Sequence, residues 1–270
     1  MSRLKHIVSG LLRRIAPPLW MSIHARRLLD KTSEYEARLL PLMVSPGEAS
    51  IDVGANIGDY AYHLRALSSR VFAFEPNPAL AAWLRGCYGR TVTVIEAALS
   101  DAAGTAELSI PLGDTGELID GHGSIENTFG VNSRTVSVPL IRLDDMDLPK
   151  IGFLKIDVEG HELIALRGAR RLLQRDRPTL LVEIEERHRK NAVRSMAEFL
   201  SEFGYQGFFV KGQTAHPIAA FDADALQNPR YVDSSPTDAE VYINNFIFVA
   251  REDARQRLLN GLSDVARRAG

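Results

Sequence analysis

Three apolar runs in the middle of the chain each end in carboxylates or glycines. They lie in residues 51–58, 71–78 and 153–162. A continuous apolar run with polar residues gathered at its end is typical of a buried parallel strand, because helices cover both faces of a parallel sheet. The carboxyl ends of parallel strands meet at one edge of the sheet, where open α/β sheets bind their ligands. The pattern therefore predicts an α/β enzyme that acts on a small molecule.

Strands and helices are expected to alternate from residue 50 onward. The predicted strands are 50–53, 70–74, 91–97, 152–157, 179–183, 205–210 and 245–249. The predicted helices are 60–67, 79–88, 162–173, 193–203 and 254–266. Alternation of this kind predicts right-handed βαβ units and a mainly parallel sheet with helices on both faces.

Two segments interrupt this alternation. Residues 106–111 and 135–141 read as short strands, and the glycine-rich run 113–133 between them has the composition of a lid, a substrate loop or a plain connector. The segment up to residue 236 that follows the strand 205–210 is punctuated by prolines, and we expect it to be irregular.

The first thirty residues are basic and amphipathic. Apolar residues recur at helical spacing from Leu4 to Ile15, and Pro17-Pro18 should end that helix. We expect an accessory helix that packs on its own domain or on a twin subunit in a homodimer. The alternatives are a peripheral helix on a membrane surface and a targeting role. The predicted organisation is a leader over residues 1–33, a main domain over 34–250 and a closing helix over 251–270.

Composition narrows the class of protein. With 45% hydrophobic and 24% charged residues, the chain has an ordinary globular composition. The net charge of −2 argues against a general nucleic-acid binder. A single cysteine, Cys87, excludes an internal disulfide framework and fits a reducing compartment. Because no apolar run approaches the roughly 20 residues of a membrane span and no cleavable signal opens the chain, we expect a cytoplasmic protein.

The turn after the first strand carries Gly54 and Gly58. Glycine lets backbone amides approach a ligand closely, and the following helix start favours a negative group. A dinucleotide site would show three glycines, but this turn offers two, with Asp52 just ahead of them. An acidic side chain there suits an amine or a sulfonium cation. S-adenosylmethionine carries both cations, and its carboxylate suits the amides of the helix start.

Glu75 strengthens the prediction of an adenosine cofactor. It ends the second strand about twenty residues after the first glycine, where an acidic side chain accepts hydrogen bonds from both ribose hydroxyls. Enzymes that use NAD share this feature, so Glu75 alone does not choose the cofactor. Ser100 and Asp101 follow the third strand, where Asp101 could read the adenine amino group or simply form a turn.

The tip of the fourth strand is rich in carboxylates. Lys155, Asp157 and Glu159 share one face of it, and Asp157 is the natural partner of a buried Lys155. Methyl transfer to an alcohol needs a base for the hydroxyl proton. Asp157 or Glu159 could serve, and Glu185 and His188 after the next strand are competitors. His161 is expected to begin the following helix, and its service as the base is an alternative. The histidines lack zinc-type spacing, so no metal site is predicted, although Mg²⁺ on Asp157, Glu159 and Glu185 is an alternative.

Taken together, the motifs resemble those of the FkbM-type methyltransferases in order and spacing over residues 34–249. The matching segments are Asp52-Val-Gly-Ala-Asn-Ile-Gly58, Phe74-Glu-Pro-Asn-Pro78, Ala97-Ala-Leu-Ser-Asp101, Leu143-Asp-Asp145, Leu154-Lys-Ile-Asp-Val-Glu-Gly160, Leu166-Arg-Gly-Ala169 and Leu181-Val-Glu-Ile184. The resemblance implies a Rossmann-like class I methyltransferase fold with seven strands, mostly parallel, of which the last is antiparallel. It also implies a cofactor site for S-adenosyl-L-methionine.

By this resemblance, the methionine end of the cofactor would lie against the first turn, the ribose on Glu75 and the adenine near Ser100 and Asp101. The full set of expected cofactor residues is Asp52, Gly54, Ala55, Asn56, Gly58, Glu75, Pro76, Asn77, Ser100, Asp101 and Asp157. The family is associated with O-methylation of sugars, glycans, lipid-linked saccharides and polyketide hydroxyls. We therefore expect an O-methyltransferase with a saccharide or related small-molecule acceptor and no nucleic-acid partner. The alternatives are a nicotinamide-dependent oxidoreductase and a cofactor-binding module without catalytic activity.

Overall fold

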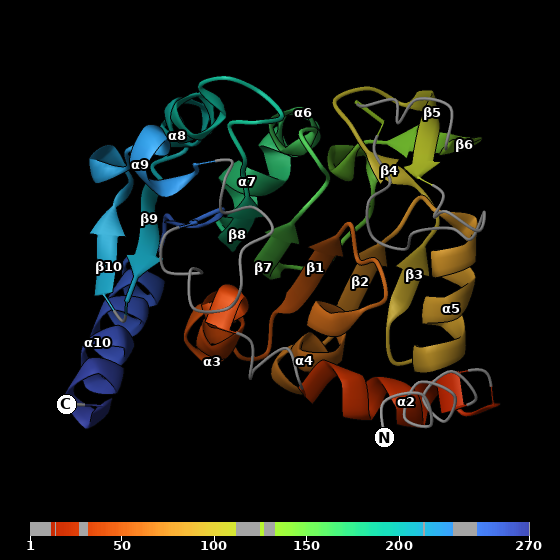
Figure 1. Cartoon of the computed structure of the whole chain (residues 1–270), viewed down its shortest axis with the longest axis horizontal. Helices are drawn as coiled ribbons and strands as arrows, with labels where there is room; N and C mark the ends of the chain where they lie inside the picture. Colours follow the sequence, from red (N-terminus) through yellow and green to blue (C-terminus); the bar gives the residue numbers. More distant parts are fainter. Residues whose placement is uncertain are drawn as a thin grey trace.

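The main sheet of the molecule has eight strands (Figure 1). The computed structural model describes residues 12–13, 15–26, 32–111, 125–126, 133–212, 214–228 and 242–269. In spatial order the strands are β10 (Thr214–Pro217), β9 (Gln206–Lys211), β11 (Asn245–Val249), β8 (Thr179–Glu183), β7 (Ile151–Ile156), β1 (Ala49–Val53), β2 (Val71–Phe74) and β3 (Thr93–Ile95).

The directions of these strands confirm the predicted architecture. Strands β3, β2, β1, β7 and β8 are parallel, and β11 runs antiparallel to its neighbours β8 and β9. This is the Rossmann-like class I methyltransferase arrangement that the resemblance implies, with one strand more than the seven expected. The additional strand, β10, forms an antiparallel hairpin with β9. The segment predicted to be irregular therefore begins with a strand, followed by η4 (Ile218–Ala220) and α9 (Ala223–Leu226).

Helices cover both faces of the sheet, each over its own apolar cluster. One face is covered by α2 (Pro17–His24), α3 (Leu40–Met43), α4 (Asp59–Leu67), α5 (Pro78–Tyr88) and α10 (Glu252–Ala269). The other is covered by α6 (Glu162–Arg167), α7 (Arg170–Asp176) and α8 (Ala192–Ser201). Neighbouring strand residues serve opposite faces: Leu154 packs in the second cluster and Phe153 in the first, as the strand period of two requires. Two 3-10 turns, η2 (Thr32–Leu39) and η3 (Leu143–Asp145), precede α3 and β7.

The helix predicted over 162–173 is interrupted, which corrects the sequence-based expectation. Helix α6 ends at Arg167, and α7 begins at Arg170. Gly168 between them packs so tightly that a Cβ there would lie 2.0 Å from the Ser100 carbonyl oxygen. The break lets the chain pass this backbone, which lies directly after the small strand β4 (Ala98–Leu99).

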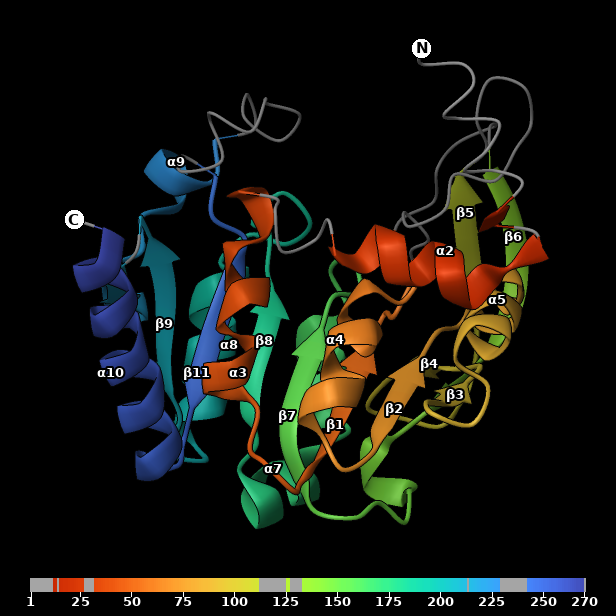
Figure 2. The ribbon, with the colours of Figure 1, turned by 90° about the horizontal axis from the view of Figure 1, so that it is seen from below.

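The amino-terminal region also departs from the prediction. The helix expected over residues 4–15 lies mostly outside the described residues. The helical residues before Pro17 do end at Ile15, as expected, because Ala16 has non-helical φ and ψ of −137° and 67°. Pro17 also begins a second helix that was not expected, α2, where its fixed φ suits the first turn. Helix α2 lies across α4 and α5 (Figure 2). Met21 and Ala25 are buried on it, and the Trp20 ring meets the Trp83 ring edge to face at 5.5 Å.

A second, three-stranded sheet stands beside the β3 edge (Figure 1). It consists of β4, β6 (Ser133–Ile141) and β5 (Gly104–Pro111), with β5 and β6 antiparallel. This confirms the two short strands predicted between the third and fourth core strands. Most of the glycine-rich run between them lies outside the described residues.

Candidate active site

The turn between β1 and α4 is held in left-handed backbone conformations. Gly54 and Gly58 have φ of +74° and +98°, and Asn56 has φ of 50°. At Gly54 a Cβ would lie 1.9 Å from the Asp157 carbonyl oxygen. Only glycine fits there, because the turn packs directly against the backbone that leaves β7. The first turn and the fourth strand tip thus form one unit.

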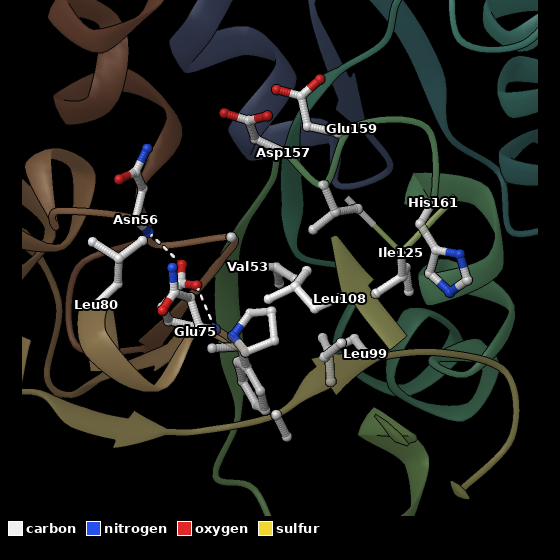
Figure 3. A pocket seen from close by; sticks show the side chains of 17 residues that line it. Val53, Asn56, Glu75, Leu80, Leu99, Leu108, Ile125, Asp157, Glu159 and His161 are labelled. Atoms are coloured by element: carbon white, nitrogen blue, oxygen red, sulfur yellow. Dashed lines mark hydrogen bonds between the residues drawn. The ribbon is translucent and has the colours of Figure 1, made fainter. Parts of the chain in front are cut away.

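Glu75 holds the tip of β2 against this turn (Figure 3). Its carboxylate accepts hydrogen bonds from the Asn56 N–H at 2.8 Å and from the Asn77 N–H at 2.9 Å. Asn77 in turn caps α5, since its side chain accepts from the Ala79 N–H at 3.0 Å. Burial raises the pKa of Glu75 to about 7, although the two backbone donors act in the opposite direction.

A pocket beside Glu75 encloses about 700 Å³, including the space at its mouth. We call it the nucleoside pocket, and its walls are mostly apolar. Leu80 lies on one side, and Leu99, Leu108 and Ile125 gather on the other (Figure 3). An acidic residue at one side of an apolar cavity suits a ligand with a flat apolar base and a sugar.

A second pocket lies on the other side of the glycine turn and shares Gly54, Asn56 and Asp157 with the first. We call it the cation pocket. Three buried acceptor oxygens in its lining have no hydrogen-bond partner: Asp52 Oδ2, Asn56 Oδ1 and Asp59 Oδ1. Buried acceptors without partners are costly, so this arrangement favours a ligand that brings donors or positive charge.

Burial in the lining of the cation pocket also affects the protonation of Asp52. Burial raises its pKa to about 6, whereas the Lys155 ammonium acts to lower it. Lys155 is itself buried, lies 4.5 Å from the centre of the Tyr60 ring and pairs with Asp157 at 3.1 Å. The predicted pair of Lys155 and Asp157 is therefore present. Asp157 remains a third exposed and lies where the two pockets meet.

The other candidate bases are engaged with cationic or phenolic partners. Glu159 lies 3.0 Å from His188 Nε2, and this hydrogen bond raises the pKa of His188. Glu185 accepts hydrogen bonds from Arg187 and from the Tyr242 hydroxyl. Burial, and then the bond to Glu185, raises the pKa of Tyr242. Of the four predicted catalytic residues, Asp157 and Glu159 line the described pockets beside the glycine turn, and Glu185 and His188 do not.

His161 joins the nucleoside pocket to the backbone beyond β4. It begins α6 as expected, and its Nδ1 lies 2.5 Å from Glu126 Oε1, while its Nε2 lies 3.2 Å from Ser100 Oγ. The order Ser–His–Glu is that of a nucleophilic triad. Ser100 is 5% exposed and lies outside the pocket lining, however, so its hydroxyl would not reach a substrate there. The chain of bonds instead fixes the His161 ring in the pocket wall.

The expected cofactor residues can now be located. All of them except Ser100 and Asp101 line one of the two pockets. Ser100 is one hydrogen bond away, through His161, and Asp101 is exposed. The sequence reasoning missed the apolar wall of Leu80, Leu99 and Leu108, and it missed His24 of α2, which lines the cation pocket. Leu80, Leu108 and His24 come from separate elements and lie in none of the matching motifs, whereas Leu99 lies within the motif at residues 97–101 but was not assigned to the site.

The described residues contain neither a metal-binding group of side chains nor a membrane-spanning helix. In this part of the chain, no group of three or more His, Cys, Asp or Glu side chains is arranged to hold a metal ion. The alternative of Mg²⁺ on Asp157, Glu159 and Glu185 is not supported, because these side chains have the separate partners given above. No described helix has the length and apolar character needed to cross a bilayer.

Comparisons with known proteins give the following matches. A family model, the methyltransferase FkbM domain, matches residues 52–206. The hexuronic acid methyltransferase AglP of Haloferax volcanii is 30% identical over 152 residues, which cover 55% of this chain and 61% of the relative. The crystal structure of a methyltransferase FkbM from Methylobacillus flagellatus is 17% identical with a TM-score of 0.46, covering 89% of this chain and 60% of that one. The crystal structure of an rRNA methylase from Streptococcus thermophilus is 13% identical with a TM-score of 0.45, covering 82% of this chain and 96% of that one. The chain thus spans less than two thirds of the first two relatives.

Proposed function

Because the chain belongs to the FkbM methyltransferase domain family, we propose that it transfers a methyl group from S-adenosyl-L-methionine to a hydroxyl group of a saccharide. The proposed catalytic unit is the main domain over residues 34–250. The observation that carries the choice of cofactor is the set of buried acceptors without partners on Asp52, Asn56 and Asp59. They surround one pocket beside the glycine turn, where an amine and a sulfonium would supply the missing donors and charge.

The neighbouring nucleoside pocket supports the same cofactor. Glu75 would accept hydrogen bonds from the ribose hydroxyls, and the apolar walls with His161 would enclose the adenine. The two pockets meet at Gly54, Asn56 and Asp157, so a ligand that fills both must pass this junction. An adenosine joined to an amino acid through sulfur has this shape.

When bound, the cofactor supplies a methyl group on a positively charged sulfur. The residues of the chain then have to place the acceptor oxygen in line and remove its proton, since oriented attack supplies much of the rate. Asp157 is the proposed general base: its carboxylate lies at the pocket junction, and Lys155 orients it at 3.1 Å. Asp157 would take the hydroxyl proton as the acceptor oxygen takes up the methyl group from the sulfonium. A positioned base contributes about 10²- to 10⁴-fold to such a rate.

The proposed acceptor class rests on the similarity to AglP, whose name gives hexuronic acid as its substrate. We extend this to a saccharide hydroxyl and to O-methylation as a proposal for this chain. The polar edge of the nucleoside pocket, which carries Asp157 and Glu159, offers acceptors for sugar hydroxyl groups (Figure 3).

The experiment is a two-step measurement on the purified chain. Calorimetry with S-adenosylhomocysteine tests the cofactor site, and radiolabelled methyl transfer to uronic-acid oligosaccharides and to neutral ones tests the acceptor. Binding with transfer to a saccharide hydroxyl supports the proposal. Binding without transfer to any saccharide favours a non-catalytic module. If NAD protects the chain against thermal unfolding and S-adenosylhomocysteine does not, the oxidoreductase alternative is favoured.

A further inference from the structure

Helix α2 exposes an apolar face. Among the described residues, the large hydrophobic side chains that are exposed are Ile15, Leu19 and Ile23, at 72%, 53% and 47%. Leu19 and Ile23 are four residues apart and therefore lie on one side of α2, whereas Ile15 precedes Ala16, whose φ of −137° and ψ of 67° are not helical. Scattered exposed apolar residues need no explanation, but their concentration on one helix face indicates a surface that is covered in use.

The exposed apolar face of α2 is not needed to pack the helix on its own domain. The opposite side of α2 already packs on the domain: Met21 and Ala25 are buried, and the Ala25 carbonyl oxygen lies 2.8 Å from His63 Nε2. Trp20 adds its ring contact to Trp83. The helix is thus held in place by one apolar face and presents a second one outward.

The positive charge of the first 29 residues favours a partner with negative charge for the exposed face of α2. The first 29 residues contain no Asp or Glu, and their basic residues are Arg3, Lys5, Arg13, Arg14, Arg26 and Arg27. Within the described part, Arg26 is exposed. An outward apolar face beside basic residues matches helices that lie in the interface of an anionic bilayer.

We propose that α2 docks on the surface of an anionic lipid bilayer, which the basic sequence around it would attract. Leu19 and Ile23 enter the boundary between headgroups and acyl chains, and Arg26 contacts lipid phosphates. A second copy of the chain fits less well, because the two basic leaders would repel each other. Nucleic acid would leave the aliphatic side chains exposed to water.

Docking in this way has a consequence for the catalytic site, which rests on the proposed function. His24 of α2 lines the cation pocket and lies 3.6 Å from Asp59 at the start of α4. A bilayer bound to α2 would therefore contact an element that contributes a residue to this pocket. This placement is compatible with the lipid-linked saccharides already associated with the family.

The test is co-sedimentation of the full chain with vesicles, without cofactor or acceptor, so that its outcome does not depend on the proposed function. One vesicle type contains equal parts of phosphatidylcholine and phosphatidylglycerol, and the other contains phosphatidylcholine alone. The wild type should bind the anionic vesicles and be released by salt at about 0.5 M. The triple variant Ile15→Ser, Leu19→Ser, Ile23→Ser should lose about tenfold or more of this binding. The matched variant Ile15→Leu, Leu19→Ile, Ile23→Leu should keep it.

Circular dichroism should show equal folding of the three proteins, since the substituted side chains are exposed. The proposal is overturned if the wild type ignores anionic vesicles or if the serine variant binds them as well as the wild type does. It is also overturned if light scattering finds a wild-type dimer that the serine variant abolishes, because the covered face would then be a subunit interface.

Discussion

Cofactor affinity should depend on pH through Glu75. In the free protein its pKa is raised to about 7 by burial, so a large part of the population is protonated near neutral pH. A ribose diol donates hydrogen bonds and binds the ionised carboxylate better. Binding therefore requires the deprotonated form, and affinity should increase as the pH rises through the pKa of Glu75.

The magnitude follows from the two raised pKa values. About nine tenths of Glu75 is ionised near pH 8 and about a tenth near pH 6, so affinity should fall about tenfold between them. Asp52, with a pKa of about 6, is about half protonated near pH 6, so its protonation should lower the affinity by about a further twofold. In Glu75→Gln the pH dependence should shrink to about twofold. Its affinity near pH 8 should be about 10- to 150-fold weaker, because a charge-assisted hydrogen bond is lost.

The assay is calorimetry with S-adenosylhomocysteine across this pH range. Titrations in two buffers of different ionisation enthalpy count the protons released on binding by Glu75, which should be about half a proton per ligand at its pKa of about 7 and should approach about one proton near pH 6. Glu96→Gln is the matched control, because Glu96 is an exposed carboxylate paired with Arg85 at 2.8 Å outside the pocket lining. An affinity that stays constant from about pH 6 to 8, with no proton release, would refute the assignment of Glu75 to the ribose.

Three further predictions concern neighbouring residues. Asp157→Asn should lower kcat about 100-fold or more while S-adenosylhomocysteine affinity changes less than about threefold; equal turnover would remove Asp157 as the base. Gly54→Ala should lower Tm by roughly 5–10 °C and abolish cofactor binding, because the added Cβ would meet the Asp157 backbone. The control is Gly86→Ala in α5, where a Cβ would meet nothing within 4 Å. It should raise Tm by about 1–3 °C, because alanine favours a helix more than glycine does. His161→Ala should weaken S-adenosylhomocysteine binding about tenfold by opening the nucleoside pocket, and the exposed Asp101→Ala should change it less than about twofold; the reverse order would place the adenine near Asp101.

The core strands could be predicted because their signal is local. Strands β8 and β11 have the predicted bounds, since each is a short apolar run with a definite start and end. The third strand is shorter than predicted: β3 covers Thr93–Ile95 and pairs only with β2 at the sheet edge. Helix propensity alone also missed the break at Gly168, which is set by the Ser100 backbone far away in sequence.

The residues of the candidate site also divide into those that a local motif marks and those that only tertiary packing places. Asp52, Gly54 and Glu75 belong to short motifs at strand ends, where topology alone places them on one edge of the sheet. Leu108 reaches the nucleoside pocket from a separate sheet, and His24 reaches the cation pocket from α2. Their placement depends on tertiary packing, for which a single sequence has no periodic or motif signal.

The contact between Gly54 and Asp157 explains why two motifs a hundred residues apart form one site. The Asp157 N–H donates to the Val53 carbonyl oxygen at 3.1 Å, and the Asp157 carbonyl oxygen occupies the space that a side chain at position 54 would need. The backbone that shapes the cofactor turn is therefore the backbone that carries the proposed base. A shift of β7 relative to β1 would displace the Asp157 carboxylate and also disturb the turn that packs on the Asp157 backbone, so cofactor affinity and acceptor chemistry are coupled through this pair of strands.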